Sequence, residues 1–262
     1  MKKPITVAML ALLLVIVTSG TGLTFGLEFA GGAWNQSPAG QLGYEEPPVT
    51  GITLDLEQDL KYTDEWRFFG WIDIDMPLFI PNIYLMATPV EFEGNGSKSV
   101  DFKFGDTIIN GSAGFFSKLT LNHADIALYY GIPLLEKATL ETLNIDIGLN
   151  IRIYDIEAQI VGEEASTSTP IDITESVTLP IPQVFLALQF RPLDWLALEA
   201  EGRGISISSN KAYSLIGRLR WNVVGPLFFT GGYRYDKIDI DEEDVRIDID
   251  ISGPFVEAGF AF

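Results

Sequence analysis

The chain has 262 residues, of which 36 are acidic and 17 are Lys or Arg, so its formal net charge is −19. This acidic excess excludes nucleic acid as an expected partner, because binding to phosphates needs clustered Lys and Arg. The chain has no cysteine, which excludes a disulfide framework, a zinc-thiolate site and a cysteine nucleophile.

The N-terminus has the layout of a secretory signal peptide. Lys2 and Lys3 precede an apolar stretch at 7–17, and small residues follow at 18–22. An uncleaved membrane anchor is the alternative, but this stretch is much shorter than the ~20 apolar residues that a spanning helix needs. We therefore expect residues 1–22 to be a cleaved signal peptide and residues 23–262 to be the mature domain.

The rest of the chain alternates between apolar and polar residues in short segments that turn residues separate. Ten such segments are found, at approximately 23–34, 64–76, 82–94, 116–130, 142–160, 174–190, 195–208, 211–223, 227–240 and 245–262. One face of each segment is apolar and the other is charged, which suits lipid outside and a polar lumen inside. The pattern predicts an all-β fold, a closed antiparallel transmembrane β-barrel of about ten strands, with eight or twelve left open.

The connections alternate in length. The links after the second, sixth and eighth segments (77–81, 191–194 and 224–226) are short and contain proline, whereas those after the first, third and fifth are long. Short periplasmic turns and long external loops give this rhythm in outer-membrane barrels. The link at 131–141 is long for a periplasmic turn, and we expect a short helix around 134–140.

Aromatic residues gather near the ends of the segments and predict two belts at the membrane interfaces. The expected periplasmic belt contains Phe25, Phe79, Tyr130, Phe190, Trp195, Trp221, Phe229 and Phe262. The expected outer belt contains Trp34, Trp66, Phe68, Phe92, Phe116, Tyr213 and Tyr235.

The apolar face changes parity within three segments. In the last segment the apolar residues from Val245 to Ile251 are odd-numbered, and after Gly253 they are even-numbered. A regular strand cannot change face, so we expect a β-bulge near 252–254, with similar breaks near 154–155 and 202–204. The alternative is that the outer halves of the strands rise above the bilayer and need no lipid-facing side.

The last segment ends in an aromatic residue, with Val256, Ala258, Phe260 and Phe262 on one face. This ending resembles the C-terminal signature of outer-membrane barrels. The resemblance implies that Phe260 and Phe262 are an assembly signal read by the barrel-assembly machinery. Together with the signal peptide it implies the outer membrane of a Gram-negative bacterium, with outer-membrane lipid and lipopolysaccharide as surroundings. The oligomeric state stays undetermined.

A second resemblance rests on the sequence Leu-Glu-Phe-Ala-Gly-Gly-Ala-Trp at 27–34 and Ser-Pro-Ala-Gly at 37–40. Residues 122–130 and the closing stretch 241–262, with its Gly-Pro-Phe at 253–255, extend it over the mature chain. The chain resembles a family of outer-membrane barrels defined by a Gly-Gly pair near the N-terminus, here Gly31 and Gly32. That family has no established activity, so the resemblance implies fold and location without chemistry.

Projecting the alternation inward places charges of both signs in the lumen. The network predicted to join neighbouring strands comprises Glu199, Glu201, Arg203, Arg218, Arg220, Arg234 and Asp236. Further inward charges are expected at Glu28, Arg67, Asp73, Asp75, His123, Asp125, Asp146, Arg152 and Glu257. Side chains nearly fill a barrel of about ten strands, so a salt-bridged plug is favoured over a selectivity lining.

Catalysis has one candidate constellation. His123 and Asp125 share a lumen face, as do Asp73 and Asp75 two strands away. This set is similar to that of the omptin proteases, and His123, oriented by Asp125, would activate water. However, omptin catalysis lies in an outer groove, whereas Asp73 and Asp75 are close to the turn at 77–81. We therefore assign no catalytic residue and keep these four as candidates.

Metal and cofactor signals are absent from the sequence. His123 is the only histidine, and the acidic stretch 236–244 lacks the spacing and central glycine of an EF-hand. No nucleophile elbow, phosphate loop or dinucleotide fingerprint occurs in a suitable context. We expect no metal and no cofactor.

The function expected from the sequence is that of an integral outer-membrane barrel with a structural or surface-interaction role. A narrow porin-like channel for small solutes and an outer-membrane hydrolase using His123 and Asp125 are the alternatives. A soluble lipid-binding barrel is the alternative for location, and it would need an apolar interior and a polar exterior.

Overall fold

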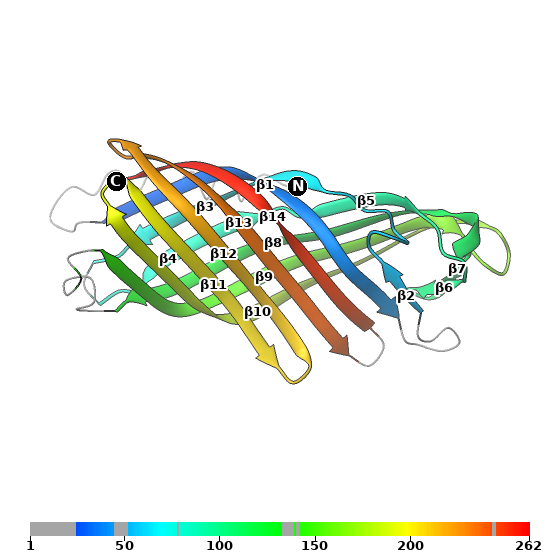
Figure 1. The fold of residues 1–262 in the computed structure, drawn as a ribbon. Helices are drawn as coiled ribbons and strands as arrows, with labels where there is room; N and C mark the ends of the chain where they lie inside the picture. The colour runs from blue at the N-terminus through cyan, green and yellow to red at the C-terminus, as the bar shows by residue number, and fades with distance from the viewer. Residues whose placement is uncertain (1–24, 45–51, 78, 133–138, 140–141, 243–244) are drawn as a thin grey trace, which may run out of the picture.

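The chain closes into a ten-strand antiparallel β-barrel. The computed structural model describes residues 25–44, 52–77, 79–132, 139, 142–242 and 245–262. The barrel closes because β1 (Gly26–Tyr44) pairs along its length with β14 (Val245–Ala261). Figure 1 shows tilted strands, with the turns at 194–195 and 225–226 and the C-terminus at one end of the barrel. The expected signal peptide and the helix expected around 134–140 lie outside the described residues.

The remaining wall strands follow one another around the barrel, each antiparallel to its neighbours. They are β3 (Glu65–Asp75), β4 (Asn82–Thr88), β8 (Phe115–Gly131), β9 (Leu143–Glu163), β10 (Pro170–Leu193), β11 (Leu196–Ile207), β12 (Asn210–Val224) and β13 (Leu227–Glu242). The predicted closed antiparallel barrel and its ten strand positions are confirmed. Several strands are longer than predicted, because β1 continues to Tyr44 and β10 begins at Pro170.

One strand position is split in two. β4 and β5 (Glu91–Gly96) pair with β8 in a single continuous register, interrupted at Pro89 and Val90. Proline has no N–H for the ladder, and the amide of Val90 instead donates to Oδ1 of Asn122 at 2.8 Å. The two pieces therefore form one wall strand with a local interruption.

Short elements extend the barrel at the end opposite to the C-terminus (Figure 1). β2 (Ile52–Asp55) pairs with the last part of β1, and β6 (Phe102–Phe104) and β7 (Thr107–Ile109) form a hairpin. A 3-10 turn, η1 (Gly111–Ala113), leads into β8. Backbone hydrogen bonds tie this region to the tip of β9, including Asn110 N to Glu163 O at 2.9 Å.

The strands that change parity contain no bulge at the expected places. The pairing of β14 with β13 runs without a shift from Val245 to Phe260, and β9 is equally regular across 154–155. The pairing of β11 with β12 is also continuous across 202–204. Register shifts occur instead beside short turns, at Phe190/Leu193 and at Asn222/Val224. The expected bulges are therefore wrong, and each strand keeps its inward face throughout.

What changes along a strand is the chemistry of its two faces. On β9, Leu149 and Ile151 are exposed while Arg152 is fully buried; further along, Glu157 is exposed and Ile160 is buried. The same exchange occurs on β14. Near the C-terminus its outward residues Val256 and Phe260 are apolar and its inward Glu257 is charged, whereas earlier in the strand the inward residues are Ile249 and Ile251. We call the part from the short turns to the level of Tyr154 and Ser252 the membrane half, and the part beyond it the outer half.

The membrane half has the surface of a transmembrane β-barrel, because apolar side chains cover its outside and charged side chains its inside. No helix among the described residues has the length and apolar character needed to cross a membrane. Aromatic side chains expected in the periplasmic belt, such as Phe79 and Trp221, are exposed, as are Trp66 and Phe68 of the outer belt. Trp34 and Phe92 are buried instead, because both lie on the inward face of their strands, so their predicted place in the outer belt is wrong.

Candidate functional site

A network of buried ions occupies the middle of the barrel. Four guanidinium groups and four carboxylates from six strands are each less than 9% exposed and paired with one another. We call this set the ion network: Arg152, Arg203, Arg218, Arg234, Asp125, Glu201, Asp236 and Glu257. These residues meet because alternate side chains of a strand point to the same face, and each of the eight lies on the inward face of its strand.

Asp125 holds the centre of the ion network. Its carboxylate accepts two hydrogen bonds from Arg152, at 2.8 and 3.0 Å, and pairs with Nη1 of Arg203 at 2.8 Å. The side-chain amide of Asn150 donates to the same carboxylate at 2.7 Å. Two charge-assisted pairs on one buried carboxylate compensate the desolvation of all three groups.

The other members extend the ion network across the lumen. Glu201 pairs with Arg203 on its own strand, and Nη1 of Arg218 lies 2.9 Å from the second oxygen of Glu201. Nε of Arg218 is 3.1 Å from Glu257, which also accepts a hydrogen bond from the indole of Trp71. On β13, Arg234 and Asp236 form a two-bond pair at 2.6 and 2.9 Å.

Aromatic rings fill the space between the charges. The guanidinium carbon of Arg234 lies 4.5 Å from the ring centre of Trp34, and that of Arg203 lies 4.8 Å from the ring of Tyr84. Trp34 was not expected in the interior, although it shares the parity of the inward Glu28 on the same strand. The even-numbered position of Trp34 therefore indicates an inward side chain, although the aromatic-belt pattern places Trp34 at the outer surface.

Predicted residues near the short turns form a second, smaller group. Arg220 pairs with Glu28 at 2.7 Å and with Glu199 at 3.6 Å, and its guanidinium lies 3.9 Å above Phe228. Both oxygens of Asp73 accept from the hydroxyl of Tyr129, at 2.8 and 2.9 Å. A cavity of about 100 Å³ opens among these side chains. The predicted network is thus divided, with Glu199 and Arg220 here and its other five residues in the ion network.

The structure keeps His123 and Asp125 together on the buried face of β8 but gives each of them other hydrogen-bond partners. Nδ1 of His123 lies 3.0 Å from the carbonyl oxygen of Leu121, and Nε2 lies 3.0 Å from Nη2 of Arg234. A carbonyl only accepts and a guanidinium only donates, so the proton resides on Nδ1 and the lone pair of Nε2 is engaged. Nε2 of His123 also lies 3.7 Å from Oδ2 of Asp236, whereas Asp73 is hydrogen-bonded to Tyr129 in the group near the short turns.

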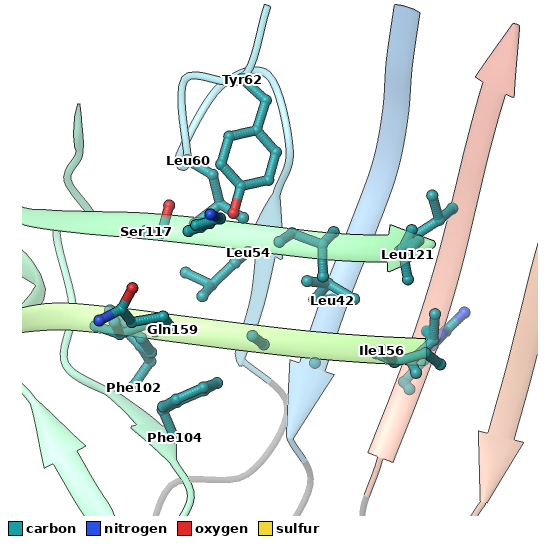
Figure 2. Close-up of a pocket in the computed structure, with 18 of the residues that line it drawn as sticks. Leu42, Leu54, Leu60, Tyr62, Phe102, Phe104, Ser117, Leu121, Ile156 and Gln159 are labelled. Carbon is teal, nitrogen blue, oxygen red and sulfur yellow. The ribbon is translucent and has the colours of Figure 1, made fainter. Parts of the chain in front are cut away.

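The outer half contains a larger and chemically different cavity of about 180 Å³. Leucine, isoleucine and phenylalanine side chains line most of it, and Figure 2 shows them converging from β1, β8 and β9 and from the segment before β3. Tyr62 and Ser117 contribute hydroxyl groups to this lining. Sequence reasoning missed this site, because it treated the inward positions of every strand as polar. The inward parity of Ile247 and Ile249 was the signal that could have revealed it.

The described residues contain no group of three or more His, Cys, Asp or Glu side chains that could hold a metal ion. The carboxylates of the ion network are paired with arginines, and the smaller cavity is lined by Arg218 and Arg220 as well as by carboxylates. The arrangement in the membrane half can therefore fill and rigidify a lumen, whereas the arrangement in the outer half can receive an apolar molecule.

No family model and no curated protein sequence matches the chain. Among solved structures, the translocator domain of the autotransporter NalP from Neisseria meningitidis is 13% identical, with coverage of 98% of this chain and 96% of that chain and a TM-score of 0.44. The attachment invasion locus protein Ail of Yersinia pestis is 11% identical, with coverage of 91% and 99% and a TM-score of 0.33. Neisserial surface protein A is 8% identical, with coverage of 92% and 100% and a TM-score of 0.31. The fold assignment above rests on the strand pairing of the chain itself.

Proposed function

We propose that the chain is an integral outer-membrane protein whose lumen is closed, so that it acts as a structural or surface-interaction barrel rather than a pore. The ion network carries this proposal. It lies between the two cavities, and its two most buried arginines, Arg152 and Arg234, are at most 1% exposed. Its equal numbers of cations and carboxylates leave no net charge to select an ion, unlike the single-sign rings that line selective pores.

Insertion into the outer membrane follows from the outside of the barrel. Charged side chains are expensive on a lipid-facing surface, and the exposed side of the membrane half is mainly apolar. In this proposal outer-membrane lipid surrounds the membrane half, and lipopolysaccharide and any surface partner meet the acidic outer half. Residues 1–22 act as the cleaved signal peptide in the same account.

The C-terminal strand supports recognition by the barrel-assembly machinery. Phe260 and Phe262 are exposed, and their rings lie 5.7 and 6.2 Å from the ring of Phe29 on the neighbouring strand. Membership of the Gly-Gly family gains a structural reason at Gly32, where a Cβ atom would lie 2.4 Å from the carbonyl oxygen of Val256. Any larger residue at this position would push β1 away from the strand that closes the barrel.

The hydrolase alternative is weakened by the hydrogen bonds of His123. A general base needs a free lone pair within reach of the proton it abstracts. Here Nε2 faces Arg234, and the carboxylate of Asp125 is bonded to two other arginines. We therefore assign His123 and Asp125 to the filling of the lumen.

Conductance in planar bilayers tests the closed lumen. The wild-type protein should give no discrete channel steps, whereas the double variant R234A/D236A should give them, because it removes a guanidinium and its carboxylate together. The control K237A/D248A removes an ion pair, with Nζ and Oδ1 2.6 Å apart, on the outside of β13 and β14, and it should give no channel steps. Stable steps from the wild-type protein, altered by R234A/D236A, would establish the narrow-channel alternative.

A further inference from the structure

The outer half has the inside and outside of a lipid-binding barrel rather than of a transmembrane barrel. Ile249 and Ile251 point inward and are at most 4% exposed, while Lys237 on the outside of the neighbouring strand pairs with Asp248 and Asp250 at 2.6 and 3.0 Å. A charged exterior suits water, and an apolar interior suits an apolar occupant. The outer half is therefore a barrel with an apolar interior and an outer surface that is too polar to lie in lipid.

The walls of the cavity are packed and hydrogen-bonded. Phe102 of the β6–β7 hairpin is 2% exposed and meets the ring of Phe115 edge-on at 5.0 Å. Tyr62, from the segment between β2 and β3, stacks on Phe92 at 6.0 Å. Side chains that line a cavity lack dispersion contacts on the side that faces it, and a ligand in the cavity could supply those contacts. The cavity is thus preformed, which is the usual state of small-molecule sites.

The floor of the cavity separates it from the ion network. Leu121 and Ile238 line the cavity, and each lies two residues along its strand from an inward polar group, His123 and Asp236 respectively. A molecule entering from the outside would therefore stop at an apolar layer above the closed lumen. The site is a dead-end pocket and needs no conduction through the barrel.

Most of the lining is aliphatic or aromatic, and its polar members other than the two hydroxyl residues are Lys103, Lys118, Gln159 and Arg246. Lys118 lies on the outward side of β8, where its ammonium pairs with Glu91 at 2.9 Å. Burial raises the pKa of Tyr62 to about 12, so its hydroxyl is neutral at physiological pH. Gln159 donates to Asp172 at 2.7 Å, and Arg246 is exposed. No acidic residue lines the cavity among the described residues.

We propose that this cavity of the outer half binds a neutral hydrophobic molecule of about the size of a single aromatic ring. The volume of about 180 Å³ slightly exceeds an engineered apolar cavity of about 150 Å³ that takes up benzene. The proposal does not depend on the closed lumen, because the cavity lies in the outer half and shares no lining residue with the ion network.

Photolabelling of the full-length protein in lipid vesicles tests the site. The probe is 3-trifluoromethyl-3-phenyldiazirine, a neutral single-ring compound, and labelled residues are located by proteolysis and mass spectrometry. We expect labelling at Leu121 and Ile156 in the cavity that excess toluene abolishes. Labelling at the lipid-facing Ile126 and Leu149 should persist with toluene, because lipid offers the probe no saturable site.

Two variants locate the effect in the cavity. Ala158→Phe places a ring among the lining residues and should reduce the toluene-sensitive labelling at least tenfold. Ala124→Phe adds the same bulk on the exposed face of β8 and should leave it unchanged. Heat-modifiable migration on gels confirms that each variant is folded. Should Ala158→Phe fail to fold, Ala158→Leu adds less bulk at the same lining position and should also reduce the toluene-sensitive labelling.

The proposal is overturned by labelling of Leu121 and Ile156 that toluene does not reduce, or by equal competition in Ala158→Phe. It is also overturned if decanoate, an anionic amphiphile, competes at least tenfold better than toluene, because the ligand would then require an acidic head group. Competition by toluene that is lost in Ala158→Phe and kept in Ala124→Phe supports it.

Discussion

The membrane half and the outer half are built from the same strands but have opposite interiors. On β13, Arg234 and Asp236 point into the ion network, and two residues further Ile238 points into the apolar cavity. The backbone geometry is the same in both halves, since the register is continuous. The difference teaches that strand alternation fixes which residues share a face, whereas the solvent at each level decides which chemistry that face carries.

Each half solves its own desolvation problem. In the membrane half the outside must be apolar, so inward charges are satisfied by one another and by inward polar groups such as the amide of Asn150, and aromatic rings fill the remaining space. In the outer half water solvates the outside, and the inside is free to be apolar. The level of Tyr154 on β9 and Ser252 on β14 is therefore the expected upper boundary of the membrane.

The largest effect is expected from Asp125→Ala. This change leaves Arg152 and Arg203 buried without their shared carboxylate, and breaking such a buried pair costs about 3–5 kcal/mol. Denaturant unfolding in lipid vesicles should show this loss. Asp250→Ala, which removes a partly exposed pair with Lys237 in the outer half, should cost less than about 1 kcal/mol. Equal losses in both variants would remove the distinction between the halves.

A charge on the outer surface should be tolerated in one half only. Leu149 is 70% exposed on the membrane half of β9, and Glu157 is exposed on the outer half of the same strand. Leu149→Arg should destabilise the folded barrel by about 2–4 kcal/mol, whereas Glu157→Arg should change it by about 0–1 kcal/mol. The same unfolding measurement compares them, and a penalty at Glu157 as large as at Leu149 would place the membrane boundary higher.

Part of the fold and part of the site were predictable from the sequence. The ten strand positions, the short turns and the inward charges on β11, β12 and β13 were predictable, because alternation and turn residues are local signals. The cavity was not predictable in this way, because the interpretation of the alternation assumed that lipid surrounds each strand along its whole length. The pairing of Asp125 with Arg152 and Arg203 was not predictable either, since it depends on the barrel shear and not on spacing within one strand.

Truncation of an inward isoleucine should have a moderate effect in the outer half. Ile249 is 1% exposed and borders the cavity. Ile249→Ala should cost about 2 kcal/mol, at the lower end of values for such truncations, because one side of the residue already faces open space. Urea unfolding measures it, and Ser252→Ala at the boundary is the matched control. A loss of about 5 kcal/mol would indicate that the residue packs against a filled core.

The smallest effect concerns the pH response of the wall segment that carries Tyr62. Its pKa is raised to about 12 by burial, so the folded state holds the proton more tightly than an unfolded tyrosine with a pKa of 10. The stabilising contribution is complete below pH 10 and falls as the pH rises toward 12. Absorbance titration of wild-type protein minus Tyr62→Phe should isolate one late-titrating phenol. A difference curve centred at pH 10 would show that Tyr62 is solvated.

Single-cysteine scanning along the outward face of β9 tests the central claim most directly, and the absence of native cysteine makes it clean. Cysteine replaces Leu149, Ile151, Ile153, Asp155 or Glu157 in turn, and a membrane-impermeant maleimide is added to vesicles containing the folded protein. We predict protection at 149, 151 and 153 and rapid labelling at 155 and 157, with the change at the level where the two faces exchange chemistry. Uniform labelling along the strand, or protection that extends through 157, would contradict the account.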